Sequence, residues 1–258
     1  MENNQGKTIG IIMTYNCSAY LEEIYNRVPK VLDEIIVVDD GSKDEAETAR
    51  VAEKLGLTFF PHEHSGYGGN LQYGLTKALE RGGDIMIEIH GDGQFDPSVI
   101  PAALEKMKEG YDFVLGSRFT DILQPLRDKM SLARYLANIG LSFLDRLILQ
   151  VPLTEFHTGF RVYSRRLIEK ISFEGTSKDY LYSFEIIAQA AYYKMKVGEI
   201  PIRCDYRKAH TSVSIWKATI YSFQTLRTLV QYILAKLGFK IALFKNETVI
   251  VKDLEPVV

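Results

Sequence analysis

One carboxylate between two glycines, Asp92 in the run from His90 to Gln94, has the setting of a ligand-binding residue. It follows an apolar run at 84–89 that predicts a buried strand, so Asp92 is expected in the turn where that strand ends. Flanking glycines allow unusual backbone angles and close approach of a ligand. Mg²⁺ and Mn²⁺ prefer oxygen ligands and often keep phosphate oxygens in their shell. We therefore expect Asp92 to bind metal, with His90 as a second ligand or a hydrogen-bonding partner of a diphosphate. The alternative role, capping the next helix, suits Asp96 better.

A pair of acids, Asp39 and Asp40, follows a second apolar run at 34–38. Acids in this position suit a nucleobase edge, ribose hydroxyls or support of a metal. The alternative is a helix cap, because Ser and Asp favour the first turn of a helix. We predict a functional role for Asp40 and a structural role for Ser42 and Asp44.

Arginines form a third group of candidates. Arg118 follows the strand expected at 112–115, and Arg161 lies in an irregular polar and aromatic segment with Glu155 and His157. The planar guanidinium group binds phosphate through two hydrogen bonds. The formal net charge of −2 gives no reason to expect nucleic acid as a partner, so an anion site must be a local cluster.

The glycines of 66–69 resemble a dinucleotide-binding loop only in part. The third glycine of that fingerprint is replaced by Leu71, so a dehydrogenase is a weak alternative.

The elements that must position these residues alternate in type. Strands are expected at 9–13, 34–38, 57–60, 84–89 and 112–115, and helices at 19–28, 43–55, 69–81 and from 97 onward. The second half predicts helices at 131–149 and 181–194, a strand at 197–206 and an irregular segment at 154–163. This order predicts an α/β fold with a mostly parallel central sheet flanked by helices. Ligands bind such sheets at the carboxyl ends of the strands, where the candidate residues should converge.

Bulk properties favour a soluble or peripheral protein of 258 residues. Two cysteines, Cys17 and Cys204, make a disulfide framework unlikely and favour a reducing cytosol. The N-terminus lacks the apolar core of a signal peptide, and no apolar run reaches the roughly 18–20 residues of a membrane span. We expect a cytoplasmic location, with peripheral attachment to the cytoplasmic face of the membrane as an alternative.

The last part of the chain, 213–258, is predicted to be a C-terminal amphipathic helix and tail, following a main domain at 1–212. An apolar stripe lies on one helical face, made of Ile220, Phe223, Leu226, Val230, Ile233 and Leu237. We expect this stripe to pack on the protein's own core or to form a homo-oligomer contact. Contact with an anionic membrane surface is the alternative.

Four motifs in this order resemble family 2 glycosyltransferases: residues 38–44, 90–94, 116–118 and 158–161. The chain looks most similar to dolichyl- and polyprenyl-phosphate mannosyl- and glucosyltransferases, over about residues 9–212. The resemblance implies a GT-A fold of Rossmann-like type, a nucleotide-diphosphate sugar donor of the GDP-mannose or UDP-glucose type, Mg²⁺ or Mn²⁺, and inversion at the anomeric carbon.

The resemblance also assigns roles to individual residues. On the donor side, it implies nucleoside or diphosphate contacts for Thr14, Tyr15, Asn16, Asp40, Gly91, Gln94, Arg207 and Ser212. On the acceptor side, we assign Arg118, Arg134 and Arg161. Asp92, Arg118 and Glu155 are the predicted catalytic residues, and Asp92 and His90 the predicted metal ligands. The chain departs from the family pattern at His90, where an acid is usual, and at Met13, His210 and Val213.

Three functions remain open from sequence. The acceptor is a lipid phosphate, which needs no strong base, or it is a saccharide or other hydroxyl, which needs one. Glu155 and His157 are the candidate bases, with a structural ion pair between Glu155 and Arg161 as the alternative. The third function is nucleotide-sugar binding without catalysis.

Overall fold

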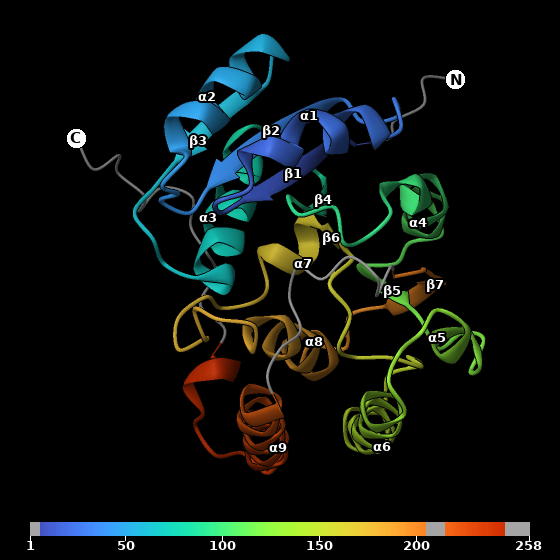
Figure 1. The fold of residues 1–258 in the computed structure, drawn as a ribbon. Coiled ribbons are helices and arrows are strands. Elements are labelled where there is room, and N and C mark those ends of the chain that lie inside the picture. The colour runs from blue at the N-terminus through green and yellow to red at the C-terminus, as the bar shows by residue number, and fades with distance from the viewer. Residues whose placement is uncertain (1–5, 205–214, 246–258) are drawn as a thin grey trace.

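A computed structural model describes residues 6–204 and 215–245 of the protein. Within them, the centre of the fold is a sheet of seven strands in the order β3-β2-β1-β4-β6-β5-β7 (Figure 1). The strands are β1 (Thr8–Thr14), β2 (Glu34–Asp39), β3 (Thr58–Pro61), β4 (Ile85–His90), β5 (Phe113–Ser117), β6 (Arg161–Ser164) and β7 (Val197–Pro201). All are parallel except β6, which lies antiparallel between β4 and β5.

Helices cover both faces of the sheet because its strands are apolar on both sides. In β1, Ile9 and Ile11 belong to one core cluster, whereas Ile12 belongs to the other. One cluster contains residues of α3 (Tyr67–Glu80) and α8 (Tyr182–Tyr192). The opposite cluster contains residues of α1 (Ser18–Arg27), α2 (Glu45–Lys54) and α4 (Ile100–Lys108). The predicted α/β class with a mostly parallel sheet is confirmed.

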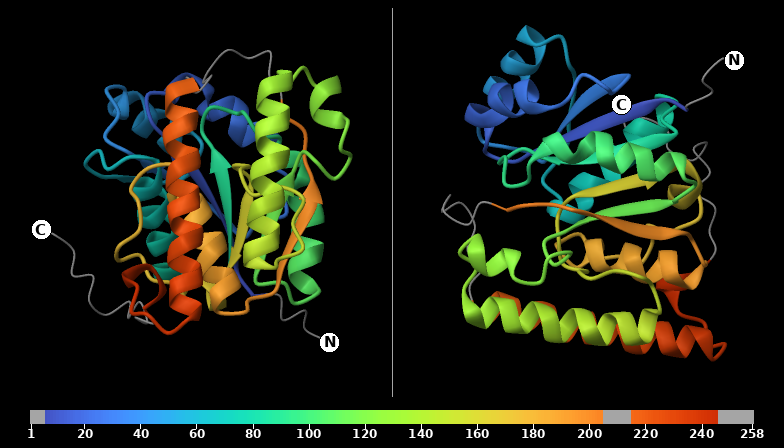
Figure 2. Two further views of the ribbon diagram at one scale, coloured as in Figure 1. Left: turned by 90° about the horizontal axis from the view of Figure 1, so that it is seen from below. Right: turned by 90° about the vertical axis from the view of Figure 1, so that its right-hand side faces the viewer.

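Two long helices lie outside these layers. Helices α6 (Leu132–Leu149) and α9 (Ile215–Lys236) lie side by side beyond α8, on the side of α8 away from the sheet (Figure 2). Helix α9 provides the predicted C-terminal helical extension. The boundary expected at 212 falls outside the described residues, so the division into two domains stays a prediction.

Four short helical turns complete the described chain: η1 (Pro97–Val99), α5 (Gln124–Arg127), α7 (Arg165–Ile168) and η2 (Ala242–Phe244). Asp96 caps η1 as predicted, since its carboxylate accepts a hydrogen bond from the Ser98 amide. Asp44 precedes α2 as expected, but its carboxylate accepts from the Ser18 amide of α1 and makes no cap to its own helix. Asp44 therefore has a structural role as expected, although it joins α1 to α2 and does not cap its own helix.

Two predictions are corrected in part by the structure. The segment 154–163 is not irregular throughout, because its end enters the central strand β6. The apolar stripe of α9 does not pack on the protein's own core, because Phe223 is 69% exposed and Leu237 is 70% exposed; the homo-oligomer contact stays a prediction. In the part of the chain that the structure describes, no helix is long and apolar enough to cross a membrane. Both cysteines are buried as free thiols.

Candidate functional site

The carboxyl ends of β1 and β2 are held together by the buried Asp39. Its Oδ2 accepts hydrogen bonds from the hydroxyls of Thr14, at 2.8 Å, and Ser42, at 2.7 Å. The Ser42 hydroxyl in turn accepts from the Asn16 amide at 2.8 Å, and the Asn16 side chain accepts from the Lys43 amide at 2.9 Å. Asp39 and Ser42 thus fix the loop after β1, where Thr14 is buried and Asn16 adopts a positive φ of 51°.

Asp40 fixes a second loop, the one that follows β3. Its carboxylate accepts hydrogen bonds from the Ser65 amide at 2.7 Å and the Gly66 amide at 3.1 Å, and it lies 2.9 Å from Nδ1 of His64. The His64 ring stacks on Tyr15, with centroids 4.7 Å apart. Tyr15 is 49% exposed, so this ring pair offers a flat aromatic surface beside Asp40. The sequence did not point to His64.

Asp92 lies in a tight turn directly after β4. The Gly91 amide donates to the Met13 carbonyl at 2.9 Å, and a Cβ at this position would lie 2.3 Å from that oxygen. Only glycine fits there. Asp92 is half-buried, and its Oδ1 accepts from the Gln94 amide at 3.0 Å. Among the described residues, none donates a hydrogen bond to its Oδ2, so this oxygen is available to bind a metal ion.

Beneath this turn lies a buried polar network centred on Glu88, which sequence reasoning missed. Glu88 accepts hydrogen bonds from His90 Nε2 at 2.8 Å, from the Tyr163 hydroxyl at 2.6 Å and from the Tyr67 hydroxyl. The Arg161 guanidinium lies 3.8 Å away. Burial alone would raise the pKa of Glu88, but the His90 hydrogen bond and the charge of Arg161 lower it below its ordinary value. A carboxylate within the buried strand at 84–89 was the available signal.

The same network fixes the state of the His90 ring. Its Nε2 lies 2.8 Å from the Glu88 carboxylate and 2.9 Å from the Gly159 carbonyl, and both groups are hydrogen-bond acceptors here. Nε2 therefore carries a proton, which leaves Nδ1 as the acceptor or ligand atom whenever the ring is neutral. Burial opposes a charge on His90, but the hydrogen bond to Glu88 raises the pKa of His90 overall.

Arg118 and Glu155 form the second charged pair at this edge of the sheet. Glu155 is fully buried and accepts from the Arg118 amide at 2.7 Å, from Nε at 2.8 Å and from the guanidinium NH2 group. The Arg118 guanidinium also reaches the His157 carbonyl at 3.4 Å. The expected structural partner of Glu155 was Arg161; the structure pairs Glu155 with Arg118 instead.

Arg134 lies in the first turn of α6. Burial raises the pKa of Cys204, and the positive charges of Arg118 and Arg134 both oppose this rise. Arg161 is not brought to this surface, because only 1% of it is exposed. Arg207 and Ser212 lie outside the described residues.

His157 joins this edge to the two outer helices. Its Nε2 lies 3.0 Å from the Asp145 carboxylate of α6, and its Nδ1 lies 3.0 Å from the Tyr221 hydroxyl of α9. A neutral ring that donates to Asp145 and accepts from Tyr221 satisfies both contacts. The side chain is nearly enclosed, so both ring nitrogens are engaged in the interior.

No group of three or more His, Cys, Asp or Glu side chains is arranged to hold a metal ion within the described parts of the chain. A metal here would depend on Asp92, with His90 Nδ1 beside it, and on oxygens of the ligand. Metal-bound histidines commonly donate their other N–H to a carboxylate or a carbonyl, as His90 does to Glu88 and Gly159. These residues fit a metal that keeps phosphate oxygens in its shell.

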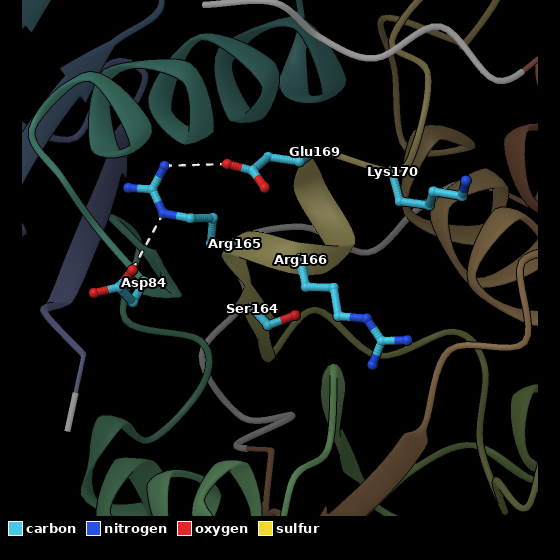
Figure 3. A pocket seen from close by; sticks show the side chains of 6 residues that line it. All are labelled: Asp84, Ser164, Arg165, Arg166, Glu169 and Lys170. Carbon is cyan, nitrogen blue, oxygen red and sulfur yellow. Dashed lines mark hydrogen bonds and ion pairs between the residues drawn. The ribbon is translucent and has the colours of Figure 1, made fainter. Parts of the chain in front are cut away.

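An open hollow of about 580 Å³ lies elsewhere, at the end of the sheet where β4 begins (Figure 3). It is lined by Asp84, Ser164, Arg165, Arg166, Glu169 and Lys170. Arg165 pairs there with Asp84 and Glu169, each at 3.2 Å, and Arg166 pairs with Asp112 at 3.2 Å. Since ligands of such sheets bind at the opposite edge, this hollow is separate from the candidate site.

Comparison with known proteins gives consistent results. The sequence profile described as Glycosyl transferase family 2 matches residues 11–172. UDP-N-acetylglucosamine–dolichyl-phosphate N-acetylglucosaminyltransferase of Methanococcus voltae is 30% identical over 217 residues, which cover 76% of this chain and 84% of that protein. Polyprenol monophosphomannose synthase of Mycolicibacterium smegmatis is 29% identical over 220 residues, covering 80% of each.

Among solved structures, glucosyl-3-phosphoglycerate synthase from Mycobacterium tuberculosis, in complex with Mn²⁺, UDP and its product, superposes with a TM-score of 0.63. The match covers 92% of this chain and 82% of that one at 16% identity, so it bears on the fold alone. That fold is of the GT-A type. The matching profile, the identity to the archaeal transferase and the shared fold together show that the chain belongs to family 2 of the glycosyltransferases.

Proposed function

We propose that the protein is an inverting glycosyltransferase that moves a sugar from a nucleotide-diphosphate donor to a polyprenyl-phosphate-like acceptor. Glycosyltransferase activity follows from family membership, and the names of two relatives include a polyprenol-type acceptor. A donor of the GDP-mannose or UDP-glucose type is part of the proposal. A transfer assay with several nucleotide sugars identifies the nucleobase and the sugar of the donor.

The observation that carries the choice of acceptor is the state of the two candidate bases. A hydroxyl acceptor must lose a proton, so a base within reach has to be free to take it. Glu155 is fully buried and both of its oxygens are bound to Arg118. His157 has both ring nitrogens engaged, by Asp145 and Tyr221. A phosphate acceptor is already anionic and needs neither group.

The charges at the site fit an anionic acceptor as well. Arg118 and Arg134 both act electrostatically on the Cys204 thiol, and guanidinium groups bind phosphate through paired hydrogen bonds. The Glu155 carboxylate holds Arg118 through its amide and its side chain, which fixes the direction of the guanidinium group. We assign acceptor binding to Arg118 and Arg134. Arg161 is buried beside Glu88, and we propose that it positions His90 through that carboxylate.

On the donor side, the proposal assigns the nucleoside to the loop of Thr14, Tyr15 and Asn16, with Asp40 and the Tyr15–His64 ring pair at its side. Gly91, Asp92 and Gln94 would face the diphosphate. Arg207 and Ser212 are assigned to the same diphosphate by family resemblance.

Mg²⁺ or Mn²⁺ bound by Asp92 and His90 Nδ1 would neutralise charge that builds on the departing diphosphate. The reaction itself is a single displacement. An oxygen of the acceptor phosphate forms a bond to the anomeric carbon, and the bond from that carbon to the nucleoside diphosphate breaks with its electron pair leaving on the diphosphate. Arg118 and Arg134 orient the attacking phosphate for this step.

A transfer assay with matched acceptors tests the proposal. The full chain is incubated with radiolabelled GDP-mannose, UDP-glucose or UDP-N-acetylglucosamine, and with either polyprenyl phosphate or the unphosphorylated polyprenol in detergent. Label is expected in the lipid fraction with one donor and with the phosphate only. Arg118→Gln is expected to abolish transfer while donor binding persists.

Two outcomes would overturn the proposal in different ways. Transfer to the polyprenol or to an oligosaccharide, with none to the phosphate, would favour the hydroxyl-acceptor function. Donor binding without transfer to any acceptor would favour the non-catalytic function.

We place the protein in the cytoplasm, where nucleotide sugars are available, and a lipid acceptor would bring it to the cytoplasmic face of a membrane.

A further inference from the structure

Helix α9 buries a face of mixed composition and leaves most of its large apolar residues outside. The buried residues are Thr225, Thr228, Leu229, Tyr232 and Ala235. On the other side, the stripe predicted from sequence is exposed, including Phe223 and Leu237 at 69% and 70%. An amphipathic helix normally buries its apolar stripe, so this face is built for another apolar phase.

Helix α6 independently shows the same feature. Its buried residues are Tyr135, Ser142, Asp145 and Leu149, and Asp145 bonds to His157. Phe143 and Leu147, the residues beside them in sequence, are 66% and 64% exposed. Leu132 and Leu136 extend the stripe toward the start of the helix. Two adjacent helices that each expose an apolar stripe together form an apolar surface.

The two helices that carry the exposed stripes run side by side beyond α8, on one side of the molecule (Figures 1 and 2). We call this surface the α6–α9 face; its exposed apolar residues are Leu132, Leu136, Phe143, Leu147, Trp216, Ile220, Phe223, Leu226, Val230, Ile233 and Leu237. Single apolar residues scattered over a protein surface need no explanation, whereas an apolar surface formed by two adjacent helices does.

The charges on these two helices have one sign. Their basic residues are Arg134, Arg146, Lys217, Arg227 and Lys236. Their single acid is Asp145, which is buried under His157 and does not reach the surface. An apolar face with basic residues and no exposed acid matches the interface of an anionic bilayer, where acyl chains meet negative headgroups.

We propose that the α6–α9 face docks the protein on an anionic lipid bilayer. A second copy of the chain is the other occupant to consider, but a self-contact would bring two sets of like charges together. A bilayer that contains anionic lipid neutralises them. The inference rests on the proposed function in one respect, since a membrane-embedded acceptor gives the docking its purpose.

The face is continuous with the acceptor side of the site. Arg134 belongs to the first turn of α6 and, like Arg118, lowers the pKa of Cys204 through its charge. Tyr221, near the start of α9, bonds to His157, whose carbonyl contacts Arg118. A bilayer against the α6–α9 face would therefore meet the site where a lipid phosphate has to enter.

Flotation of the full chain on a density gradient tests the docking. Vesicles of phosphatidylcholine alone are compared with vesicles of phosphatidylcholine and phosphatidylglycerol in equal amounts. We expect the chain to float with the anionic vesicles, to float poorly with the neutral ones, and to dissociate as salt is raised. The double variant Leu147→Glu/Phe223→Glu should lower the bound fraction roughly tenfold or more.

Val31→Glu is the matched control, because Val31 is 49% exposed and lies in the turn before β2, outside both helices. It should float like the unaltered chain. Since all three side chains are exposed, melting temperatures should stay close together, and this is measured first. Salt and lipid dependence of the unaltered chain test the docking without any variant.

The docking idea is overturned by absence of flotation with anionic vesicles, or by equal flotation of the double variant and the control. It is also overturned by a dimer in sedimentation equilibrium that the double variant splits while vesicles bind neither form. Transfer to polyprenyl phosphate in detergent separates the two proposals. If that transfer persists in a chain that does not float, the docking fails and the proposed function stands.

Discussion

Replacement of Glu155 by Gln tests the central ion pair of the site. The substitution keeps the shape of the side chain but removes the charge that faces the Arg118 guanidinium. Glu155 is fully buried and the Arg118 side chain is 11% exposed, so little water is available to replace the lost partner. Removing one member of a buried pair costs about 3–5 kcal/mol, because the other charge is left uncompensated. Glu155→Gln should lower the free energy of unfolding by about that amount.

Urea unfolding followed by circular dichroism measures this change directly. For a chain of this size about 2–4 °C of melting temperature are lost per kcal/mol, so thermal unfolding should shift by roughly 6–20 °C. Glu105→Gln is the control, since Glu105 is 68% exposed and pairs with Lys108 on the surface of α4. Exposed pairs of this kind contribute about 0–1 kcal/mol.

A double-mutant cycle with Arg118→Gln separates the pair from its surroundings. If the two residues stabilise one another, the double variant should be less destabilised than the sum of the single variants. Additive effects, or a Glu155→Gln variant as stable as the Glu105→Gln control, would refute the ion-pair interpretation. Glu155 would then be available as a general base, and the argument for a phosphate acceptor would lose its main support.

Three further predictions concern the donor side and the interior. Gly159→Ala should destabilise the fold by about 1–3 kcal/mol and weaken donor binding, because the added Cβ would lie 2.5 Å from the Phe95 ring and 2.9 Å from His90 Nε2; unchanged urea midpoints and nucleotide affinity would contradict this. Asp92→Asn should remove the Mn²⁺-dependent part of the thermal shift produced by UDP or GDP, and an unaltered metal dependence would exclude Asp92 as the ligand. Burial raises the pKa of Glu185 despite the opposing Ser177 hydrogen bond and the charge of Arg227, so the folded state binds this proton more tightly than the unfolded state. Stability should therefore fall as pH rises from the ordinary pKa of a glutamate through the raised value, and Glu185→Gln should flatten that slope in urea unfolding at a series of pH values.

The first half of the fold was predictable because two physical signals agree there. Buried parallel strands are apolar throughout, and turn residues follow them, as in β2 with its acids and β4 with its glycines. Since all carboxyl ends of parallel strands meet at one edge, the neighbourhood of Thr14, Asp40 and Asp92 followed from chain order alone.

The charge pairings were not predictable in the same way. Glu155 was expected to face Arg161, its neighbour in sequence, but Arg161 enters the central strand β6 and faces Glu88. A four-residue antiparallel strand leaves almost no periodic signal, and its position between β4 and β5 is decided by tertiary contacts. Glu155 was left to pair with Arg118, which is distant in sequence and adjacent in space.

The orientation of α9 shows a more general limit. A period of 3.6 residues separates two faces of a helix, but it does not say which of them is buried. Hydrophobicity favoured the apolar stripe, because burying a free hydroxyl is costly. In α9 that cost is small: the Thr225 and Thr228 hydroxyls donate to the carbonyls of Tyr221 and Gln224, at 3.0 and 3.1 Å, one turn earlier in the same helix. The face with Thr225 and Thr228, which also carries the buried Leu229, can therefore be buried without hydrogen-bond partners from other elements. The exposed apolar stripe is then available for a second apolar phase.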